Sequence, residues 1–389
     1  MIHIVSAICW GYLSGQGTDF GRLVLYLSDG RSVSVIGPMK NITLGQEILW
    51  PWLEGVAVEN DFINVVSDLV KNNLGLDNKE VGWLLSVAAA RAVALINKQP
   101  LFKSLVPTND FKVLPQPLVN FFCGSRYGDT VLEFDEFLVL PNRHNVLSVA
   151  EKIKNLRSIR QKLGEILLDS GLDTDSGSWG GFAPELVSSV RALELLVASI
   201  KSSGFTDRDY NLGVVVGAGQ LFEAKKHRYI FSLDGCQLQA VDLATLYNDW
   251  LAKFDVTYLE DVAAAEDETS WQLLSKDLRG KVLLSGREYF ANQESRLRLA
   301  IKEKIANTVS VNPASFFGIK EFLEYCQLAK RHNYAIVIDG GADETADDWL
   351  ADLAVAAGAD YLKAGSILRS EFIAKYNRLV AIENYQANN

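Results

Sequence analysis

Residues 256–340 decide the fold, and they read VTYLEDVAAAEDETSWQLLSKDLRGKVLLSGREYFANQESRLRLAIKEKIANTVSVNPASFFGIKEFLEYCQLAKRHNYAIVIDG. Short apolar runs alternate in this stretch with amphipathic helical segments. The runs are at 256–259, 282–284, 308–311 and 335–338, and the helical segments are at about 267–277, 293–304 and 318–332. This alternation predicts parallel strands joined by crossover helices.

The same rhythm continues on both sides of this stretch. Further strands are expected at 136–140, 213–216 and 361–362, and further helices at 146–169, 185–203, 242–253 and 344–357. The alternating part covers ~260 residues, which is the size of one (β/α)8 barrel. We therefore predict an α/β fold with a C-terminal (β/α)8-type barrel. Function is expected at the carboxyl ends of its strands, where barrel enzymes place their chemistry.

The residues before the barrel have a different pattern. Alternating apolar residues at 23–27 and 32–36 flank a Ser-Asp-Gly turn at 28–30, which predicts a β-hairpin. Helical spacing follows over about 60–100, so we expect a small α+β domain. Three prolines fall within 106–117, which is the best linker candidate. We place the N-terminal domain at 1–115 and the barrel at 116–389.

The composition argues against two classes of partner, nucleic acids and membranes. The chain has 389 residues, 48% of them hydrophobic, and a net charge of -10. An acidic surface repels phosphate backbones, so nucleic acid is not an expected partner. The four cysteines form no CxxC pair, as in reduced chains of the cytoplasm. No apolar run reaches ~18 residues, so no membrane contact is expected. We expect a cytoplasmic protein.

Several short stretches have a characteristic order and spacing. The most distinctive are 352–355 (DLAV), 362–371 (LKAGSILRSE) and 374–379 (AKYNRL). Others are Val119-Asn120, Asp135-Glu136-Phe137, Gly180-Gly181-Phe182-Ala183-Pro184, Leu259-Glu260-Asp261 and Ala306-Asn307. Together they resemble enolase, the magnesium-dependent enzyme that interconverts 2-phosphoglycerate and phosphoenolpyruvate, over nearly the whole chain. The resemblance implies a small α+β domain before an eight-stranded barrel, and a homodimer.

The magnesium ligands of that family are only partly present. Enolase holds the charge of its enolate intermediate with two magnesium ions, which need carboxylates at strand ends. The first family aspartate falls on Val216, and the second carboxylate is kept as Glu260. The third falls on Arg287, in the run Gly286-Arg287-Glu288-Tyr289. We therefore expect magnesium binding to be lost and no cofactor to be needed.

The family's proton-transfer groups are also replaced. The base lysine falls on Asn312, and an amide cannot act as a general base at neutral pH. The second catalytic carboxylate falls on Trp179, in front of a double glycine. The family histidine falls on Tyr127. These three positions are therefore expected to have lost their catalytic roles.

The phosphate-gripping loop has changed in the same way. The family run Ser-His-Arg-Ser-Gly-Glu-Thr reads DGGADET at 339–345. Its histidine and arginine fall on Gly340 and Gly341, and Asp339 would add negative charge where a phosphate should lie. Glu136 and Lys363 are retained.

Two interpretations of the remaining pocket stay open. Its residues are Glu136, Glu260, Arg287, Glu288, Asp339 and Lys363. In one, Arg287 replaces the lost Mg²⁺ and neutralises Glu260 and Glu136, which would otherwise be buried without a counter-ion. In the other, Arg287 binds an anionic substrate. Trp179 is expected to fill space that a substrate once occupied, or to stack on a new ligand.

The functional expectation is therefore a pseudoenzyme. It should lack 2-phosphoglycerate dehydratase activity and act by binding a protein partner or a regulatory ligand. The alternative is an enzyme with diverged, metal-independent chemistry on a small anionic molecule. An open cavity at the strand ends favours the alternative. Plugging of that mouth by Trp179, Tyr127 and Phe316 argues against it.

Overall fold

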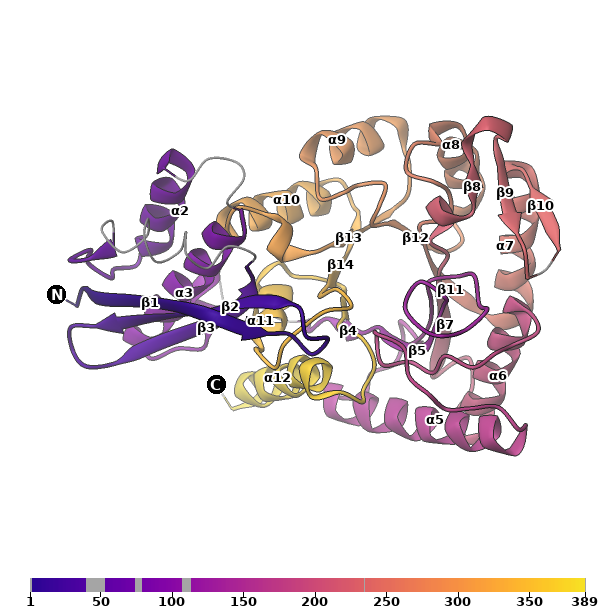
Figure 1. Ribbon diagram of the computed structural model, residues 1–389, viewed down its shortest axis with the longest axis horizontal. Coiled ribbons are helices and arrows are strands. Elements are labelled where there is room, and N and C mark those ends of the chain that lie inside the picture. The colour runs from indigo at the N-terminus through magenta and orange to yellow at the C-terminus, as the bar shows by residue number, and fades with distance from the viewer. Residues whose placement is uncertain (1, 40–52, 74–78, 107–112, 234, 389) are drawn as a thin grey trace.

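The computed structural model describes residues 2–39, 53–73, 79–106, 113–233 and 235–388 (Figure 1). The chain begins with an antiparallel meander of β1 (Ile4–Leu13), β2 (Asp19–Leu27) and β3 (Ser32–Pro38). The predicted hairpin joins β2 to β3. Gly30 has φ +85° there, a conformation that favours glycine, and its N–H donates to the Leu27 carbonyl.

Three helices follow the meander: α2 (Phe62–Asn73), α3 (Lys79–Ile96) and α4 (Leu101–Leu105). The middle of α3 is buried from Val81 to Ala90, because small apolar residues let neighbouring elements approach it from all sides. α3 contacts β2, β3, α2 and α4. Its Trp83 also packs edge-on against Trp349 of the barrel, with ring centroids 5.5 Å apart. α3 therefore joins the N-terminal elements to the barrel.

The barrel sheet confirms the predicted fold class. Its strand order is β4-β15-β14-β13-β12-β11-β7-β6-β5. The strands are β4 (Gln116–Pro117), β5 (Val119–Cys123), β6 (Glu136–Pro141), β7 (Tyr210–Val215), β11 (Val256–Glu260), β12 (Leu283–Gly286), β13 (Thr308–Val311), β14 (Ala335–Asp339) and β15 (Tyr361–Lys363). Only Leu118 separates β4 from β5, and its N–H donates to the Leu362 carbonyl at 2.9 Å. β4 and β5 are thus halves of one stave that closes the barrel.

The expectation that all strands are parallel is wrong at one place. β6 runs antiparallel to both β5 and β7. No helix lies between β5 and β6, so the chain simply turns back through the loop at 124–135. Two helices, α5 (Val149–Asp169) and α6 (Ser189–Ser202), then lie between β6 and β7.

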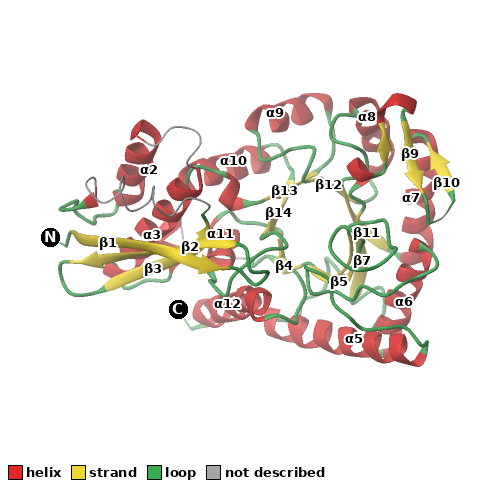
Figure 2. Ribbon diagram, in the orientation of Figure 1, coloured by secondary structure: helices red, strands yellow, loops and turns green. Residues whose placement is uncertain are grey.

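The remaining helices lie outside the strands (Figure 2). They are α7 (Ala240–Phe254), α8 (Glu268–Leu278), α9 (Glu294–Glu303), α10 (Ile319–Arg331), α11 (Trp349–Ala356) and α12 (Ser370–Ala387). A small antiparallel sheet that the sequence did not predict, β8 (Phe222–Glu223), β9 (Arg228–Phe231) and β10 (Cys236–Leu238), follows β7. No helix among the described residues combines the length and apolar character that crossing a membrane requires.

The helix expected from residue 344 begins at Trp349, because the acidic residues before it make tertiary contacts instead. Asp347 pairs with Arg91 of α3 and accepts a hydrogen bond from the Ile36 N–H of β3 at 2.8 Å. The loop between β1 and β2 lies against the same segment, with Gly15 N–H donating to the Glu344 carbonyl at 2.8 Å. These contacts hold the N-terminal sheet beside the carboxyl ends of the barrel strands.

Candidate functional site

One rim of the barrel gathers most of the residues singled out from the sequence. Glu260, Asp339 and Lys363 are the last residues of β11, β14 and β15. Glu136 is the first residue of β6 and reaches the same rim only because β6 runs antiparallel. It lies opposite Val215 of β7, which in turn lies opposite Glu260.

Lys363 is the centre of a buried ion cluster formed with Glu136, Glu260 and Asp339. Its Nζ lies 3.2 Å from Glu136, 2.6 Å from Glu260 and 3.1 Å from Asp339. All four side chains are at most 1% exposed. Burial by itself would lower the pKa of Lys363, but the three carboxylates raise it well above its ordinary value. The ammonium therefore stays charged and serves as a shared counter-ion.

The carboxyl groups of the buried ion cluster differ in their protonation. Burial raises the pKa of Glu136 to about 7, although Lys363 and an Asn120 N–H donated at 2.7 Å both favour the ionised form. Burial also opposes the charge of Asp339, but Lys363 and Arg287 bring its pKa below the ordinary value. Glu260 accepts a further hydrogen bond from the Tyr258 hydroxyl. The cluster can thus hold a proton on Glu136 near neutral pH.

Arg287 follows β12 and has a different partner from the one expected. Its Nη1 lies 3.4 Å from Asp339, and its Nη2 donates to the Tyr127 hydroxyl at 3.1 Å. Glu260 and Asp339 both help to raise the pKa of Arg287, but the ammonium in direct contact with Glu260 and Glu136 is that of Lys363, at the end of β15. The Arg287 side chain is 21% exposed, so it lies above the cluster, toward solvent.

Trp179 covers the buried ion cluster from one side. It is fully buried, and its ring centroid lies 5.5 Å from the Lys363 Nζ. Tyr127 packs edge-on against it, with centroids 5.9 Å apart. Phe316 does not join them, because its ring packs on Phe322 and Tyr325 of α10. Of the three bulky residues considered as plugs, Trp179 and Tyr127 pack together beside the cluster and Phe316 packs on α10 instead.

Glu288 lies outside the buried ion cluster, in a second charged group that the sequence reasoning missed. Arg126 Nη1 lies 2.7 Å from Glu288 and 3.2 Å from Asp135. Burial raises the pKa of Asp135 to about 6. Asp261 accepts the backbone N–H groups of Arg287 and Glu288, at 2.8 and 3.0 Å. The sequence feature that could have indicated this second group is the pair of adjacent carboxylates at each strand end, Asp135 beside Glu136 and Asp261 beside Glu260.

A cavity of about 300 Å³ opens above the buried ion cluster, and we call it the rim cavity. It is lined by Phe20, Pro38, Tyr127, Arg287, Asn312, Ala314, Gly340, Gly341, Ala342, Asp343, Glu344 and Trp349. Phe20 and Pro38 come from the N-terminal sheet, so the cavity lies where the two parts of the chain meet. Neither Glu136, Glu260 nor Lys363 lines it. The barrel rim is therefore open to solvent at Arg287 and Tyr127, whereas the carboxylates of the buried ion cluster are closed off from this cavity.

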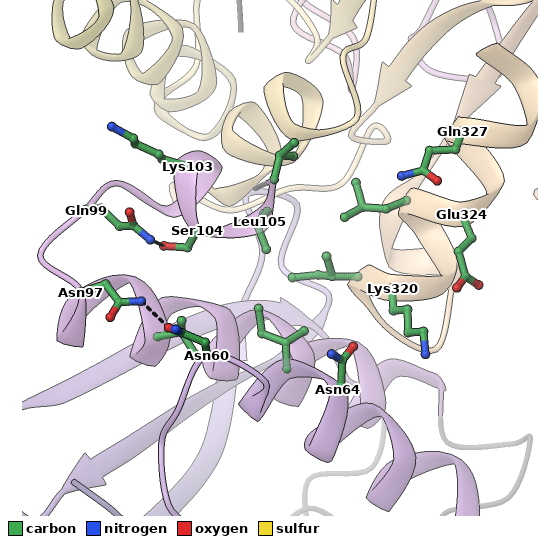
Figure 3. Close-up of a pocket in the computed structure, with 15 residues that line it drawn as sticks. Asn60, Asn64, Asn97, Gln99, Lys103, Ser104, Leu105, Lys320, Glu324 and Gln327 are labelled. Carbon is green, nitrogen blue, oxygen red and sulfur yellow. Dashed lines mark hydrogen bonds between the residues drawn. The ribbon is translucent and has the colours of Figure 1, made fainter. Parts of the chain in front are cut away.

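A second cavity, of about 720 Å³, lies between α2, α3, α4 and α10 (Figure 3). Amide side chains are frequent in its wall, and two of them bond to neighbours: Asn97 to Asn60 at 2.9 Å and Gln99 to the Ser104 hydroxyl at 3.0 Å. None of the site residues proposed from the sequence lines it.

Among the residues that the structure describes, no group of three or more His, Cys, Asp or Glu side chains is placed to hold a metal ion. Val216, at one of the family's ligand positions, is fully buried, and its N–H donates to the Glu260 carbonyl at 2.9 Å.

Comparisons with known proteins agree with this fold. The family model described as "Enolase, C-terminal TIM barrel domain" matches residues 111–389. The enolase of Ehrlichia ruminantium (strain Gardel) is 28% identical over 345 residues, covering 88% of this chain and 80% of that protein. The enolase of Natranaerobius thermophilus is 33% identical over 313 residues, covering 80% of this chain and 71% of that protein. This chain belongs to the enolase family.

Proposed function

We propose that this enolase-family protein does not interconvert 2-phosphoglycerate and phosphoenolpyruvate and that it acts by binding a regulatory ligand or a protein partner. The observation that carries the proposal is the buried ion cluster. Its single ammonium contacts Glu136, Glu260 and Asp339 within 3.2 Å, and all four groups are sealed from solvent. Glu136, Glu260 and Lys363 do not line the rim cavity and Trp179 covers their cluster, so these groups are not available to a substrate in that cavity.

Magnesium, which the family resemblance implies, does not fit the residues present. Mg²⁺ requires oxygen ligands in a nearly ideal octahedron at ~2.0–2.1 Å. Glu260 offers one carboxylate, but Lys363 and Tyr258 already contact its oxygens. Val216 provides no donor atom, and Arg287 would place a positive charge beside the ion. A cation of the chain's own thus occupies the electrostatic role of the metal.

Proton abstraction also lacks a suitable group. Asn312 stands at the family's base position, and its Oδ1 accepts the Ala314 N–H at 2.9 Å. Glu136 has a pKa of about 7, which suits a general base, but it is only 1% exposed and lies behind Lys363. This arrangement favours binding over the second candidate, diverged metal-independent catalysis.

A turnover assay on the full chain tests the proposal. The purified protein is incubated with 2-phosphoglycerate and millimolar Mg²⁺, with an active enolase alongside as positive control. We expect no phosphoenolpyruvate above the protein-free background. A magnesium-dependent rate like that of the active enolase would overturn the proposal. The homodimer implied by the family resemblance stays a prediction, for which sedimentation analysis of the same sample is the measurement.

A further inference from the structure

Three residues that can donate hydrogen bonds, Arg287, Tyr127 and Asn312, line the rim cavity. Arg287 uses one N–H group on Asp339 and one on Tyr127, which leaves further guanidinium hydrogens. The Tyr127 hydroxyl accepts from Arg287 and can donate its own proton. Asn312 uses its Oδ1 on Ala314, and its Nδ2 has no acceptor among the described residues. A planar carboxylate matches such a set of donors, because guanidinium binds it in a bidentate manner.

The loop after β14 contributes a carboxylate. Asp343 lines the rim cavity, and its Oδ2 accepts a hydrogen bond from the Thr18 hydroxyl. Its other oxygen, Oδ1, is enclosed by protein atoms, so a ligand meets the part of the side chain that lines the cavity. Within the described residues no cation pairs with this carboxylate. An ammonium group of a ligand would supply the missing counter-charge.

The rim cavity presents charges of both signs to a ligand, Arg287 on one element and Asp343 on another. Arg287 is already partly balanced by Asp339, whereas Asp343 makes no ion pair with any residue that the structure describes. A phosphorylated acid such as 2-phosphoglycerate would add several negative charges beside these two carboxylates. A zwitterion adds one charge of each sign.

We infer that the rim cavity binds a small zwitterion of the α-amino-acid class, with its carboxylate at Arg287, Tyr127 and Asn312 and its ammonium at Asp343. Apolar surface of Phe20, Pro38 and Ala314 is left for a short side chain. The volume of about 300 Å³ lies at the lower end of small-molecule sites, so the ligand is small. The inference rests on the proposed function, because it assigns a ligand class to the same rim.

Thermal melting of the full chain with matched probes tests this inference. The probes are L-alanine and L-serine as zwitterions, L-lactate as a carboxylate without an ammonium, ethylamine as an ammonium without a carboxylate, and 2-phosphoglycerate with Mg²⁺. We expect a zwitterion to raise the melting temperature and the other probes to leave it unchanged. Calorimetric titration of the stabilising probe then gives its dissociation constant.

Two variants separate a specific site from a general salt effect. Asp343→Asn keeps the shape of the side chain and should weaken zwitterion binding at least about tenfold, because the ammonium loses its counter-ion. Asp249→Asn on α7 removes the same charge from a side chain that is 60% exposed and remote from the cavity. This control should bind like the wild type.

Each contrary outcome is informative. Absence of any zwitterion effect, or an equal effect in Asp343→Asn, overturns the inference. Binding of lactate as tightly as alanine overturns it too, because the site would then be one for anions. If 2-phosphoglycerate is turned over, the proposed function fails. If 2-phosphoglycerate and the zwitterions are all inert, only the ligand class fails and the proposed function stands.

Discussion

The substitution Lys363→Met tests the buried ion cluster most directly. Methionine keeps the unbranched length of the side chain and removes the ammonium. Glu136, Glu260 and Asp339 then lose a counter-ion that lay within 3.2 Å of each. Among the described residues, these three carboxylates keep one ion pair, between Asp339 and Arg287 at 3.4 Å.

The expected loss of stability follows from the cost of unpaired buried charge. Removing one partner of a buried ion pair costs about 3–5 kcal/mol. Three carboxylates are affected here, and two like charges ~4 Å apart repel by about 4 kcal/mol at an effective dielectric constant of ~20. Protonation relieves part of this repulsion, beginning with Glu136, whose pKa is already about 7. We therefore expect a loss of about 4 kcal/mol near neutral pH.

The pH dependence has a definite sign. Without Lys363, the folded variant holds the protons of these carboxyl groups more tightly than the unfolded chain does. Its stability relative to wild type must then fall as the pH rises above about 4, the ordinary range for carboxyl groups, because the three carboxyl groups no longer ionise beside an ammonium. The loss should be larger at about pH 8 than at about pH 5.5.

Urea unfolding followed by tryptophan fluorescence measures the effect at both pH values. Lys253→Met on α7, where the side chain is 66% exposed, is the matched control and should stay within about 0.5 kcal/mol of wild type. The double variant Lys363→Met with Glu260→Gln removes one of the stranded charges and should recover part of the loss. A loss below about 1 kcal/mol at both pH values would refute the reasoning, because removal of a buried counter-ion should destabilise the protein by more than that.

Three further predictions concern the same rim and its supports. The pKa of Glu136 is about 7 in the folded protein against an ordinary 4.5, so the free energy of unfolding of the wild type should fall by up to about 3 kcal/mol as the pH rises between these values. Glu136→Gln should remove this pH dependence, and urea midpoints of both proteins across that range check it. Gly124→Ala should destabilise by about 3 kcal/mol, since its Cβ would lie 1.8 Å from the Phe134 carbonyl oxygen, whereas Gly280→Ala, with nothing within 4 Å, should be neutral in the same assay. Neither EDTA nor millimolar Mg²⁺ should move the melting temperature, and a rise with Mg²⁺ would contradict the proposal that magnesium does not bind.

The sequence by itself determined the architecture. Helical spacing and short apolar runs between 256 and 340 report which residues are buried, and that information is local, so β11 to β14 and α8 to α10 could be located from it. Outside this stretch, β4, β5 and α12 were not predicted. The hairpin around Gly30 was readable because its turn chemistry lies within a few residues. The enolase resemblance also singled out Glu136, Glu260, Asp339 and Lys363 before any contact between them was known.

Only the tertiary structure decided how those groups are paired. Lys363 and Glu136 are 227 residues apart, and their contact depends on β6 running antiparallel, which the strand pattern did not reveal. The sequence placed Glu260, Arg287 and Lys363 in one pocket, but only the structure shows that the cation in contact with Glu260 is Lys363. The rim cavity was likewise invisible, since it forms where Phe20 of the N-terminal sheet meets Asp343 of the barrel. Burial periodicity is a property of neighbouring residues, but ion pairing and cavity shape depend on which distant strand ends share a rim.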